Sequence, residues 1–363
     1  MNNEIPAEVL EAFTTYSQNH PVHSAGEIKV ERMNGGLINH TYKVTKGFKS
    51  DILLQQINKN VFAKPEDVQE NYLAIWQYAE SACTGLRLPF PNYCGKNCTL
   101  FIDENENYWR AFEFIEDSRM ISVAENPAQA KATANAFATF TAVFNDFNIR
   151  MLKNVIPGFH DLRLRYRQFE EAINGASNER LPKALSIVEA LKQRERYKHF
   201  YETIIESDEF PQRVMHHDAK IANVLFSNKT GKVICLVDFD TAMPGYFFSD
   251  IGDMIRSMVS SEEENSTNAD SISIRKDFYE AILSGYMEVI GHQLTVSEKK
   301  HIHFAGLLMI YMQALRFIAD YLNGDVYYRI NYPGQNFDRA GNQLTLLQKL
   351  EDFLYKHYHF RDE

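Results

Sequence analysis

Cysteine is scarce in this chain, and the few cysteines form none of the patterns that would give them a function. The four, Cys83, Cys94, Cys98 and Cys235, include no pair separated by two residues. Such a pair is the usual mark of a redox motif or of a structural zinc site. We therefore expect reduced thiols in a cytoplasmic protein.

Long uncharged apolar runs are also missing. The amino terminus, MNNEIPAEVL, has no basic stretch followed by an apolar segment, so a signal peptide is not expected. The most apolar helical stretch, Phe304 to Leu322, is interrupted by Gln313, Arg316 and Asp320. These interruptions favour a buried core helix over a membrane span.

Positive charge is outnumbered. Lysine and arginine total 38 against 48 aspartates and glutamates, which gives a net charge of −10. An acidic surface repels phosphate backbones and anionic lipids, so we expect neither nucleic acid nor a membrane as partner. An anionic substrate would need its charge offset locally, by a metal ion or by a few well-placed cations.

The hydrophobic pattern divides the chain into two parts, in line with about two domains for 363 residues. The first part is strand-rich, with strands predicted over 28–33, 41–45, 51–57, 99–103 and 108–115, and helices over 6–20 and 65–82. The second part is mainly helical, with helices predicted over 128–147, 180–206, 271–290, 297–322 and 343–357. An α+β fold with a boundary near residues 115–118 follows.

One strand-like island in the helical part, from Val214 to Asp240, carries the most informative residues. An apolar strand leads into a turn with Asp218, Asn223 lies five residues further on, and a later apolar strand ends in Asp238. Phosphoryl transfer explains this combination, because one carboxylate must accept the proton of the attacking hydroxyl while oxygen ligands hold Mg²⁺. Asp218 is therefore the predicted base, and Asn223 and Asp238 are the predicted Mg²⁺ ligands.

The same island matches the protein-kinase signature of a catalytic loop followed by a D-F-G segment. His216, Asp218 and Asn223 match the loop, and Asp238-Phe239-Asp240 stands at the second site without the glycine. Lys220 is a candidate for contact with the transferred phosphoryl group. Surface turns with chance Asp and Asn residues are the alternative, and the flanking apolar strands argue against it.

Further segments extend this match, namely residues 36–42, 54–58, 216–245, 315–317, 323–328 and 336–340. Through them the chain resembles the aminoglycoside phosphotransferase and choline kinase superfamily, and within it the N-acetylhexosamine 1-kinases. The resemblance implies a protein-kinase-like two-lobed fold. It implies a strand-rich nucleotide-binding lobe over residues 1–116 and a mainly helical catalytic and substrate-binding lobe over residues 117–363.

The resemblance also implies ATP and Mg²⁺ as cofactors, a sugar acceptor, and site residues outside the island. Gly35 and Gly36 would cover the ATP phosphates, and Glu113 with Ile115 would form the hinge that offers backbone groups to adenine. Asp250 would brace the catalytic loop. From the residues alone, the two glycines could equally form a plain hairpin turn.

By the same resemblance, Arg316 and Tyr327 would face the sugar. Arg316 lies inside an apolar helix, and a buried arginine needs a partner. Asp320 on the next turn is the structural alternative to a substrate oxygen, and Tyr327 could be a packing aromatic.

One departure from the kinase pattern leaves a second interpretation open. Many kinases carry a lysine on the third strand that contacts the nucleotide phosphates, but this chain has Leu54-Gln55-Gln56-Ile57 there. A nucleotide-binding pseudokinase scaffold is therefore an alternative, against which the intact Asp218, Asn223 and Asp238 argue.

The leading hypothesis is ATP-dependent phosphorylation of the anomeric hydroxyl of an N-acetylhexosamine such as GlcNAc or GalNAc. The enzyme alternative is a kinase for another small alcohol, such as choline, homoserine or an aminoglycoside. A choline site would show an aromatic cage for the quaternary ammonium group.

Overall fold

The computed structural model describes residues 5–18, 26–33, 38–47, 49–82 and 84–360. The chain forms two compact units. Unit 1 comprises Met1–Arg119, Phe147–Pro157 and Leu225–Met243, and unit 2 comprises Met120–Asp146, Gly158–Val224 and Pro244–Glu363. The first segment of unit 1 ends close to the boundary expected from the sequence, but two later segments return to unit 1.

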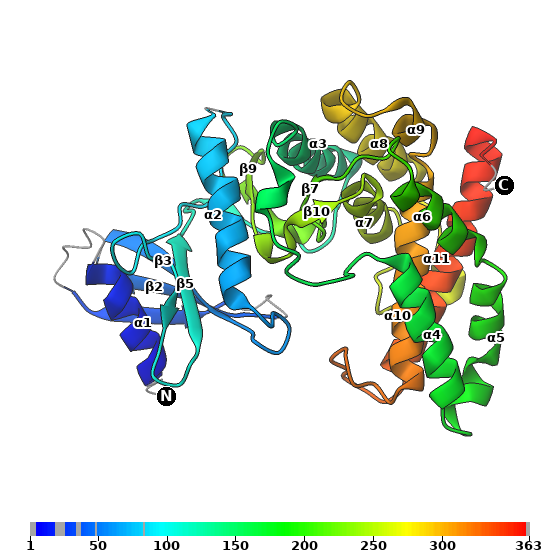
Figure 1. The fold of residues 1–363 in the computed structure, drawn as a ribbon, viewed down its shortest axis with the longest axis horizontal. Coiled ribbons are helices and arrows are strands. Elements are labelled where there is room, and N and C mark those ends of the chain that lie inside the picture. Colours follow the sequence, from blue (N-terminus) through cyan, green and yellow to red (C-terminus); the bar gives the residue numbers. More distant parts are fainter. Residues whose placement is uncertain (1–4, 19–25, 34–37, 48, 83, 361–363) are drawn as a thin grey trace. The chain divides into compact units, whose positions relative to one another are not determined.

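Unit 1 is built on an antiparallel five-stranded sheet in the order β1-β2-β3-β5-β4 (Figure 1). Its elements are α1 (Ala7–Gln18), β1 (Ile28–Arg32), β2 (His40–Lys46), β3 (Lys49–Ile57), α2 (Pro65–Ser81), β4 (Phe101–Ile102), β5 (Tyr108–Glu113), β6 (Ser118–Arg119), η1 (Ile149–Met151), β8 (Val224–Ser227), β9 (Val233–Leu236) and η3 (Phe239–Thr241).

The two faces of this sheet have different tasks. The helix α1 buries Val9, Ala12, Phe13 and Tyr16, a helical i, i+3, i+4, i+7 stripe, against alternate residues of the central strands. Those strand residues are Ile52, Leu54, Trp109 and Ala111. Since successive side chains of a strand point to opposite faces, Gln55 and Arg110 lie on the face away from α1.

A small three-stranded sheet explains why a late segment belongs to unit 1. Its strand order is β6-β8-β9, and Ser118 and Arg119 pair with Ser227 and Phe226 of β8. Because this pairing joins residues that are more than a hundred positions apart, a linear boundary at residue 117 cannot describe it.

Unit 2 is mainly helical, which agrees with the predicted α+β class. Its elements are α3 (Pro127–Val143), α4 (Leu162–Gly175), α5 (Arg180–Lys192), α6 (Arg196–Glu206), β7 (Arg213–Met215), η2 (Ile221–Asn223), β10 (Met243–Gly245), α7 (Phe248–Met258), η4 (Ala269–Ser271), α8 (Lys276–Ile290), α9 (Val296–Lys300), α10 (Phe304–Leu322) and α11 (Gln335–Tyr358). β10 starts at the last residue of unit 1 and pairs with β7.

The helix α10 is the core of unit 2. It packs against α4, α5, α7 and α11, and it is long and apolar enough to cross a membrane by length and composition alone. However, 89 % of its most apolar stretch is buried inside the protein. The helix α10 contacts α7 closely at Gly252, where a side chain would collide with the carbonyl oxygen of Ala305.

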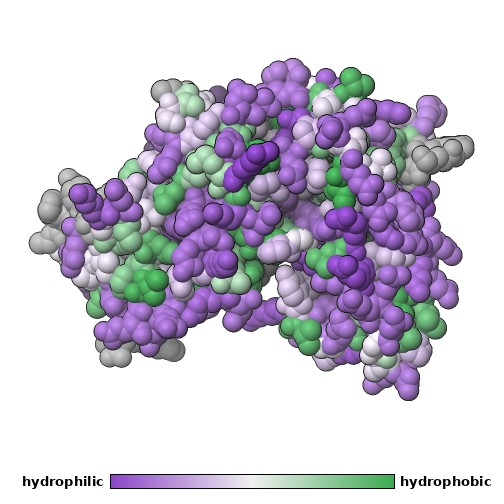
Figure 2. All heavy atoms as spheres, viewed as in Figure 1, coloured by the Kyte–Doolittle hydropathy of each residue, from purple (hydrophilic) through white to green (hydrophobic). Residues whose placement is uncertain are grey.

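Figure 2 shows that most of the visible surface is hydrophilic and that apolar groups are scattered over it.

Several helices differ from their predicted bounds. The predicted helix 180–206 is two helices, since Arg194 turns back to donate to the carbonyl oxygen of Ala190 at 2.9 Å and ends α5. The predicted helix 297–322 is also two, since α9 ends at Lys300 and α10 begins at Phe304; a capping box of Thr295 and Glu298 starts the short α9. The prediction contained neither α4 nor α7.

The helix α11 begins eight residues earlier than predicted, at Gln335 instead of residue 343. Gly334 starts it in a left-handed conformation with φ 90°. Its first residues, Gln335 and Asn336, are polar but buried. Hydrophobic periodicity cannot detect a first turn whose buried face consists of amides.

Candidate active site

Three of the predicted catalytic residues lie together in unit 2. The strand β7 leads into the loop with Asp218, and η2 ends at Asn223. The Asp218 carboxylate is 2.9 Å from Lys220 Nζ and accepts a hydrogen bond of 2.8 Å from Asn223 Nδ2. Burial raises the pKa of Asp218, but Lys220 and the hydrogen bond from Asn223 outweigh it and hold the pKa below its usual value. The carboxylate is therefore ionised at neutral pH.

The catalytic loop is held in a strained conformation. His217 has φ 64°, in the left-handed region that non-glycine residues rarely occupy. Asp250, at the start of α7, accepts the backbone N–H groups of His216 at 2.9 Å and of His217 at 2.8 Å. Gly245 lies against the His217 ring, where any side chain would collide. Asp250 thus braces the loop, as the sequence led us to expect.

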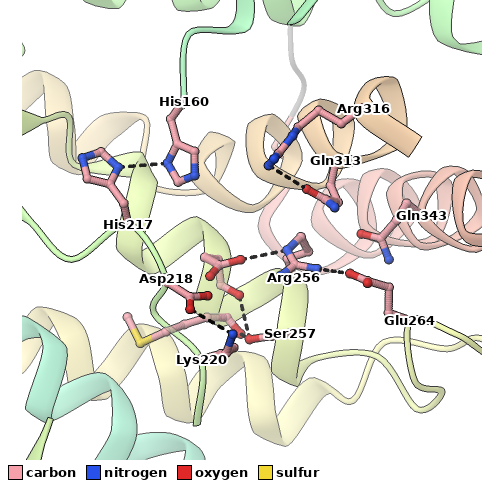
Figure 3. A network of polar contacts seen from close by, with 12 residues as sticks. His160, His217, Asp218, Lys220, Arg256, Ser257, Glu264, Gln313, Arg316 and Gln343 are labelled. Carbon is pink, nitrogen blue, oxygen red and sulfur yellow. Dashed lines mark hydrogen bonds and ion pairs between the residues drawn. The ribbon is translucent and has the colours of Figure 1, made fainter. Parts of the chain in front are cut away.

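The pKa of the Asp250 carboxylate is raised. Burial raises the pKa of Asp250 to about 7, and the nearby carboxylates of Asp253 and Asp218 add to the effect, while the two backbone hydrogen bonds oppose it. Asp253 in turn pairs with Arg256 at 2.8 Å, and Arg256 also pairs with Glu264 at 2.5 Å. Figure 3 shows Arg256 and its pair with Glu264 beside Asp218.

Asp238 and Asp240 lie in unit 1, where their environments differ sharply. Asp238 follows β9, is exposed and has φ 66°, again left-handed. Asp240 is 4 % exposed. It forms an ion pair with Arg110 and accepts a hydrogen bond of 2.5 Å from Asn39 Nδ2. Its oxygens are committed to the protein, so Asp240 is a poor candidate for a metal ligand.

A buried guanidinium on the neighbouring strand lies opposite the segment where the third-strand lysine is missing. Arg110 on β5 pairs in register with Gln55 on β3 and donates to its side-chain oxygen at 3.1 Å. Arg110 is 2 % exposed. The neighbouring strand therefore supplies a cation over Gln55. Sequence reasoning missed Arg110 and Asn39, because only the strand pairing and the fold bring them to Asp240.

The remaining predicted nucleotide contacts have a mixed outcome. Gly35 and Gly36 lie outside the described residues. The backbone N–H of Glu113 donates to the carbonyl oxygen of Phe90 at 2.9 Å, so this group of the predicted hinge is already engaged. Ile115 is buried, and its carbonyl oxygen accepts from Ser118 Oγ at 2.5 Å.

The two residues predicted to face the sugar lie together in unit 2. The guanidinium carbon of Arg316 is 5.9 Å from the centre of the Tyr327 ring and 5.4 Å from those of Tyr328 and Phe159. Tyr327 is 63 % exposed, which does not fit a packing aromatic. The side chain of Arg316 donates to Gln313 Oε1 at 3.3 Å.

Asp320 is not the partner of Arg316. Its carboxylate accepts the backbone N–H groups of Val326, Tyr327 and Tyr328 at 2.8 to 3.0 Å, and the side chain of Asn336 at 2.9 Å. Asp320 therefore positions the loop that brings both tyrosines to Arg316. The pairing that the sequence left open is excluded by these contacts.

Two residues without any motif complete this region. Arg165 on α4 donates twice to the carbonyl oxygen of Phe159, at 3.0 and 3.3 Å. His160 stacks on the Phe159 ring and lies 3.1 Å from His217, nitrogen to nitrogen. Burial, followed by the charges of His217, Arg316 and Arg165, lowers the pKa of His160 well below 6.5. His160 is therefore neutral at physiological pH.

The two predicted Mg²⁺ ligands, Asn223 of unit 2 and Asp238 of unit 1, each carry the kind of oxygen that a hard divalent cation binds. Both contacts of the Asn223 amide nitrogen go to Asp218, one to its carboxylate and one to its backbone oxygen, each at 2.8 Å. The amide oxygen of Asn223 thus remains for another ligand, and Asp238 supplies a carboxylate at the end of β9. Amide and carboxylate oxygens are the ligands that Mg²⁺ prefers.

The model of the phosphotransferase enzyme family matches residues 29–282. A choline kinase from Cryptosporidium parvum Iowa II is similar in structure, with TM-score 0.59 and 15% identity over 97% of both chains. An aminoglycoside phosphotransferase from Alicyclobacillus acidocaldarius has TM-score 0.59 and 14% identity over 91% of this chain and 94% of that one.

A third similar structure holds a nucleotide. An amicoumacin kinase in complex with AMP-PNP and Ca²⁺ has TM-score 0.54 and 13% identity over 94% of this chain and 96% of that chain. At such identities the likeness shows the fold. The predicted α+β class, an antiparallel sheet followed by a mostly helical part, is thereby confirmed.

Proposed function

Because the chain belongs to the phosphotransferase enzyme family and is a small-molecule phosphotransferase of the aminoglycoside phosphotransferase and choline kinase type, we propose that it phosphorylates the anomeric hydroxyl of an N-acetylhexosamine. The donor in this proposal is ATP with Mg²⁺, and the products are a sugar 1-phosphate and ADP. GlcNAc and GalNAc are the acceptors we favour.

Asp218 is the proposed base. Its lowered pKa keeps the carboxylate ionised, so it can accept the proton of the sugar hydroxyl as the oxygen attacks the γ-phosphorus. The new bond forms between that oxygen and phosphorus, and the bond from phosphorus to the β,γ-bridging oxygen breaks as ADP leaves. An anomeric hydroxyl is more acidic than an ordinary alcohol, so a carboxylate of modest basicity suffices.

Lys220 and two oxygen ligands complete the assignment. Lys220 lies 2.9 Å from Asp218, so its ammonium group is placed to offset the charge of the transferred phosphoryl group. Asn223 and Asp238 are the proposed Mg²⁺ ligands. Bound Mg²⁺ neutralises charge on the phosphates during transfer.

The observation that carries the sugar assignment is the aromatic surrounding of Arg316. A cage of three rings would suit a quaternary ammonium ligand, but in this chain Phe159, Tyr327 and Tyr328 surround the protein's own guanidinium. This positive charge disfavours cationic acceptors, such as the choline and aminoglycosides named for the similar structures. A planar guanidinium offers paired donors that suit sugar and acetamide oxygens.

The residues of the candidate active site argue against the pseudokinase alternative. That alternative rests on the absence of a third-strand cation, which Arg110 does not replace, because it is buried and paired with Asp240. However, Asp218, Lys220 and Asn223 keep mutual contacts that a degenerate site would not require.

An ADP-release assay tests the proposal. The purified full-length protein is incubated with Mg·ATP and a panel of N-acetylhexosamines, choline, homoserine and an aminoglycoside, with Asp218→Asn as control. We expect turnover with an N-acetylhexosamine only, and a product that is stable to reducing-end oxidation because its anomeric oxygen is blocked. Faster turnover with any of the three amines would refute the sugar assignment.

A further inference from the structure

Arg165 and Arg316 of unit 2 are half-buried, and neither has an acidic partner among the described residues. Arg316 donates to Gln313, and Arg165 donates to the carbonyl oxygen of Phe159 and to Gln168 Oε1 at 3.0 Å. Among the described residues no carboxylate lies within ion-pair distance of either guanidinium. Arg275 and Arg339 likewise donate only to carbonyl or amide oxygens, whereas four other partly buried arginines of this unit pair with carboxylates, namely Arg180, Arg194, Arg213 and Arg256.

The acids nearest to them in the fold are already committed. Asp161 caps α4 through the backbone of Arg163 and also pairs with its guanidinium at 3.2 Å. Glu264 pairs with Arg256, and Asp320 holds the backbone of the tyrosine loop. Removing a charge from water is costly unless a partner replaces the water. Because these acids pair elsewhere, neither guanidinium has an ion pair that would offset this cost.

The two arginines also act on each other. Burial, followed by the positive charge of Arg316, lowers the pKa of Arg165 to about 10. The same two charges help to keep His160 neutral. A protein with a net charge of −10 therefore maintains a local excess of positive charge here. An oxyanion bound to both guanidiniums would relieve that repulsion.

This positive region adjoins the catalytic loop. Phe159 connects the two arginines, its ring facing Arg316 and its carbonyl oxygen accepting from Arg165. His160 stacks on that ring and contacts His217, the residue directly before Asp218. Figure 3 shows His160, His217, Asp218 and Arg316 in this arrangement, with His217 linking the region to the loop.

We propose that Arg165 and Arg316 bind an anionic substituent, a carboxylate or a phosphate, on the sugar acceptor. The inference rests on the proposed function and specifies its substrate class: an acidic hexose derivative with a free anomeric hydroxyl. The competing source of an oxyanion is the phosphoryl group that is transferred, and the experiment below separates the two.

The test compares three acceptors that share one sugar and differ in a single substituent. They are a neutral N-acetylhexosamine, the same sugar carrying a carboxylate ether, and the same sugar carrying a 6-phosphate. ADP release gives kcat/KM for each with the wild-type protein at saturating Mg·ATP. Because a hydrogen bond to a charged group is stronger than one between neutral groups, we expect kcat/KM for at least one acidic sugar to exceed that for the neutral sugar by ~10-fold or more.

Arg165→Gln is the decisive variant, and Arg167→Gln is its matched control. Arg167 lies on the same helix α4 and is exposed. We expect Arg165→Gln to lower kcat/KM for the acidic sugar ~10-fold and for the neutral sugar less than 3-fold. Arg167→Gln should change neither value, and KM for ATP should be the same in all three proteins.

Each other outcome has a definite meaning. If the neutral sugar is used as well as both acidic sugars, the anion site is refuted while the sugar kinase stands. If Arg165→Gln damages all acceptors equally and raises KM for ATP, the arginines bind the transferred phosphoryl group and the inference also fails.

If no sugar is turned over, calorimetric titration with the two acidic sugars in the absence of nucleotide decides. Binding that is lost in Arg165→Gln but kept in Arg167→Gln supports the anion site although the proposed function has failed. No binding refutes both.

Discussion

Replacing Arg110 with methionine should destabilise unit 1 strongly. Arg110 and Asp240 are 2 % and 4 % exposed and form an ion pair, to which Gln55 and Asn39 contribute hydrogen bonds of 3.1 and 2.5 Å. Methionine fills much of the arginine volume but leaves the Asp240 carboxylate buried with one amide donor. Removing one partner of a buried ion pair typically costs about 3–5 kcal/mol.

The assay is thermal and urea unfolding at pH 7, followed by circular dichroism. A loss of that size corresponds to about 10 °C in Tm for a unit of this size. Two variants serve as references. Arg110→Met/Asp240→Asn removes the stranded charge and should recover most of the loss. Arg87→Met breaks an exposed pair with Glu113 at 3.5 Å and should cost less than ~1 kcal/mol.

The reasoning would be refuted by either of two results. A loss below about 1 kcal/mol in Arg110→Met would mean that water or a rearranged donor compensates Asp240. A double variant that is less stable than the single one would mean that the uncompensated charge is not the cause. Weaker Mg·ATP binding in the single variant is expected as well, since Asn39 and Asp240 adjoin the segments predicted to contact nucleotide.

Four further predictions concern the catalytic loop, the predicted metal ligand and the acceptor residues. Asp218→Asn should keep the fold and Mg·ATP binding but lose ~10²–10⁴ in turnover, because a positioned base is worth that much; more than half of wild-type activity would remove Asp218 from the role. Asp238→Ala should abolish Mg²⁺-dependent turnover at unchanged Tm, whereas Asp240→Ala should lower Tm; the opposite pattern would reverse the ligand assignment. Arg316→Ala should lower kcat/KM for the sugar ~10-fold or more with little change in KM for ATP, and equal damage to both in a less stable protein would refute the sugar contact. For Asp250, the folded pKa of about 7 lies above the ordinary value of 3.8, so its contribution to stability is complete below pH 4 and is lost as pH rises through 7; the destabilisation caused by Asp250→Asn, measured by urea unfolding, should therefore be larger at pH 5 than at pH 8.

The sequence by itself determined the part of the candidate site whose residues lie close together along the chain. Asp218, Lys220 and Asn223 lie within six positions, so one loop carries them together, and their chemistry could be read from spacing alone. The strands and helices with clear periodicity were predicted within a few residues, as for β1 and α2. The mainly helical second part was also predictable, because each helix needs an apolar stripe facing the core.

Only the tertiary structure decided which distant residues act together. The pairing of Arg110 with Asp240 spans 130 positions, and the meeting of Arg165 with Arg316 through Phe159 depends on the packing of α4 against α10. Neither contact can be predicted from the spacing of residues along the chain, because each joins residues that only the fold brings together. The polar first turn of α11 escaped prediction, as did the lack, among the described residues, of an acid paired with Arg316. The reason is the same: burial of polar groups depends on partners that only folding brings within hydrogen-bond distance.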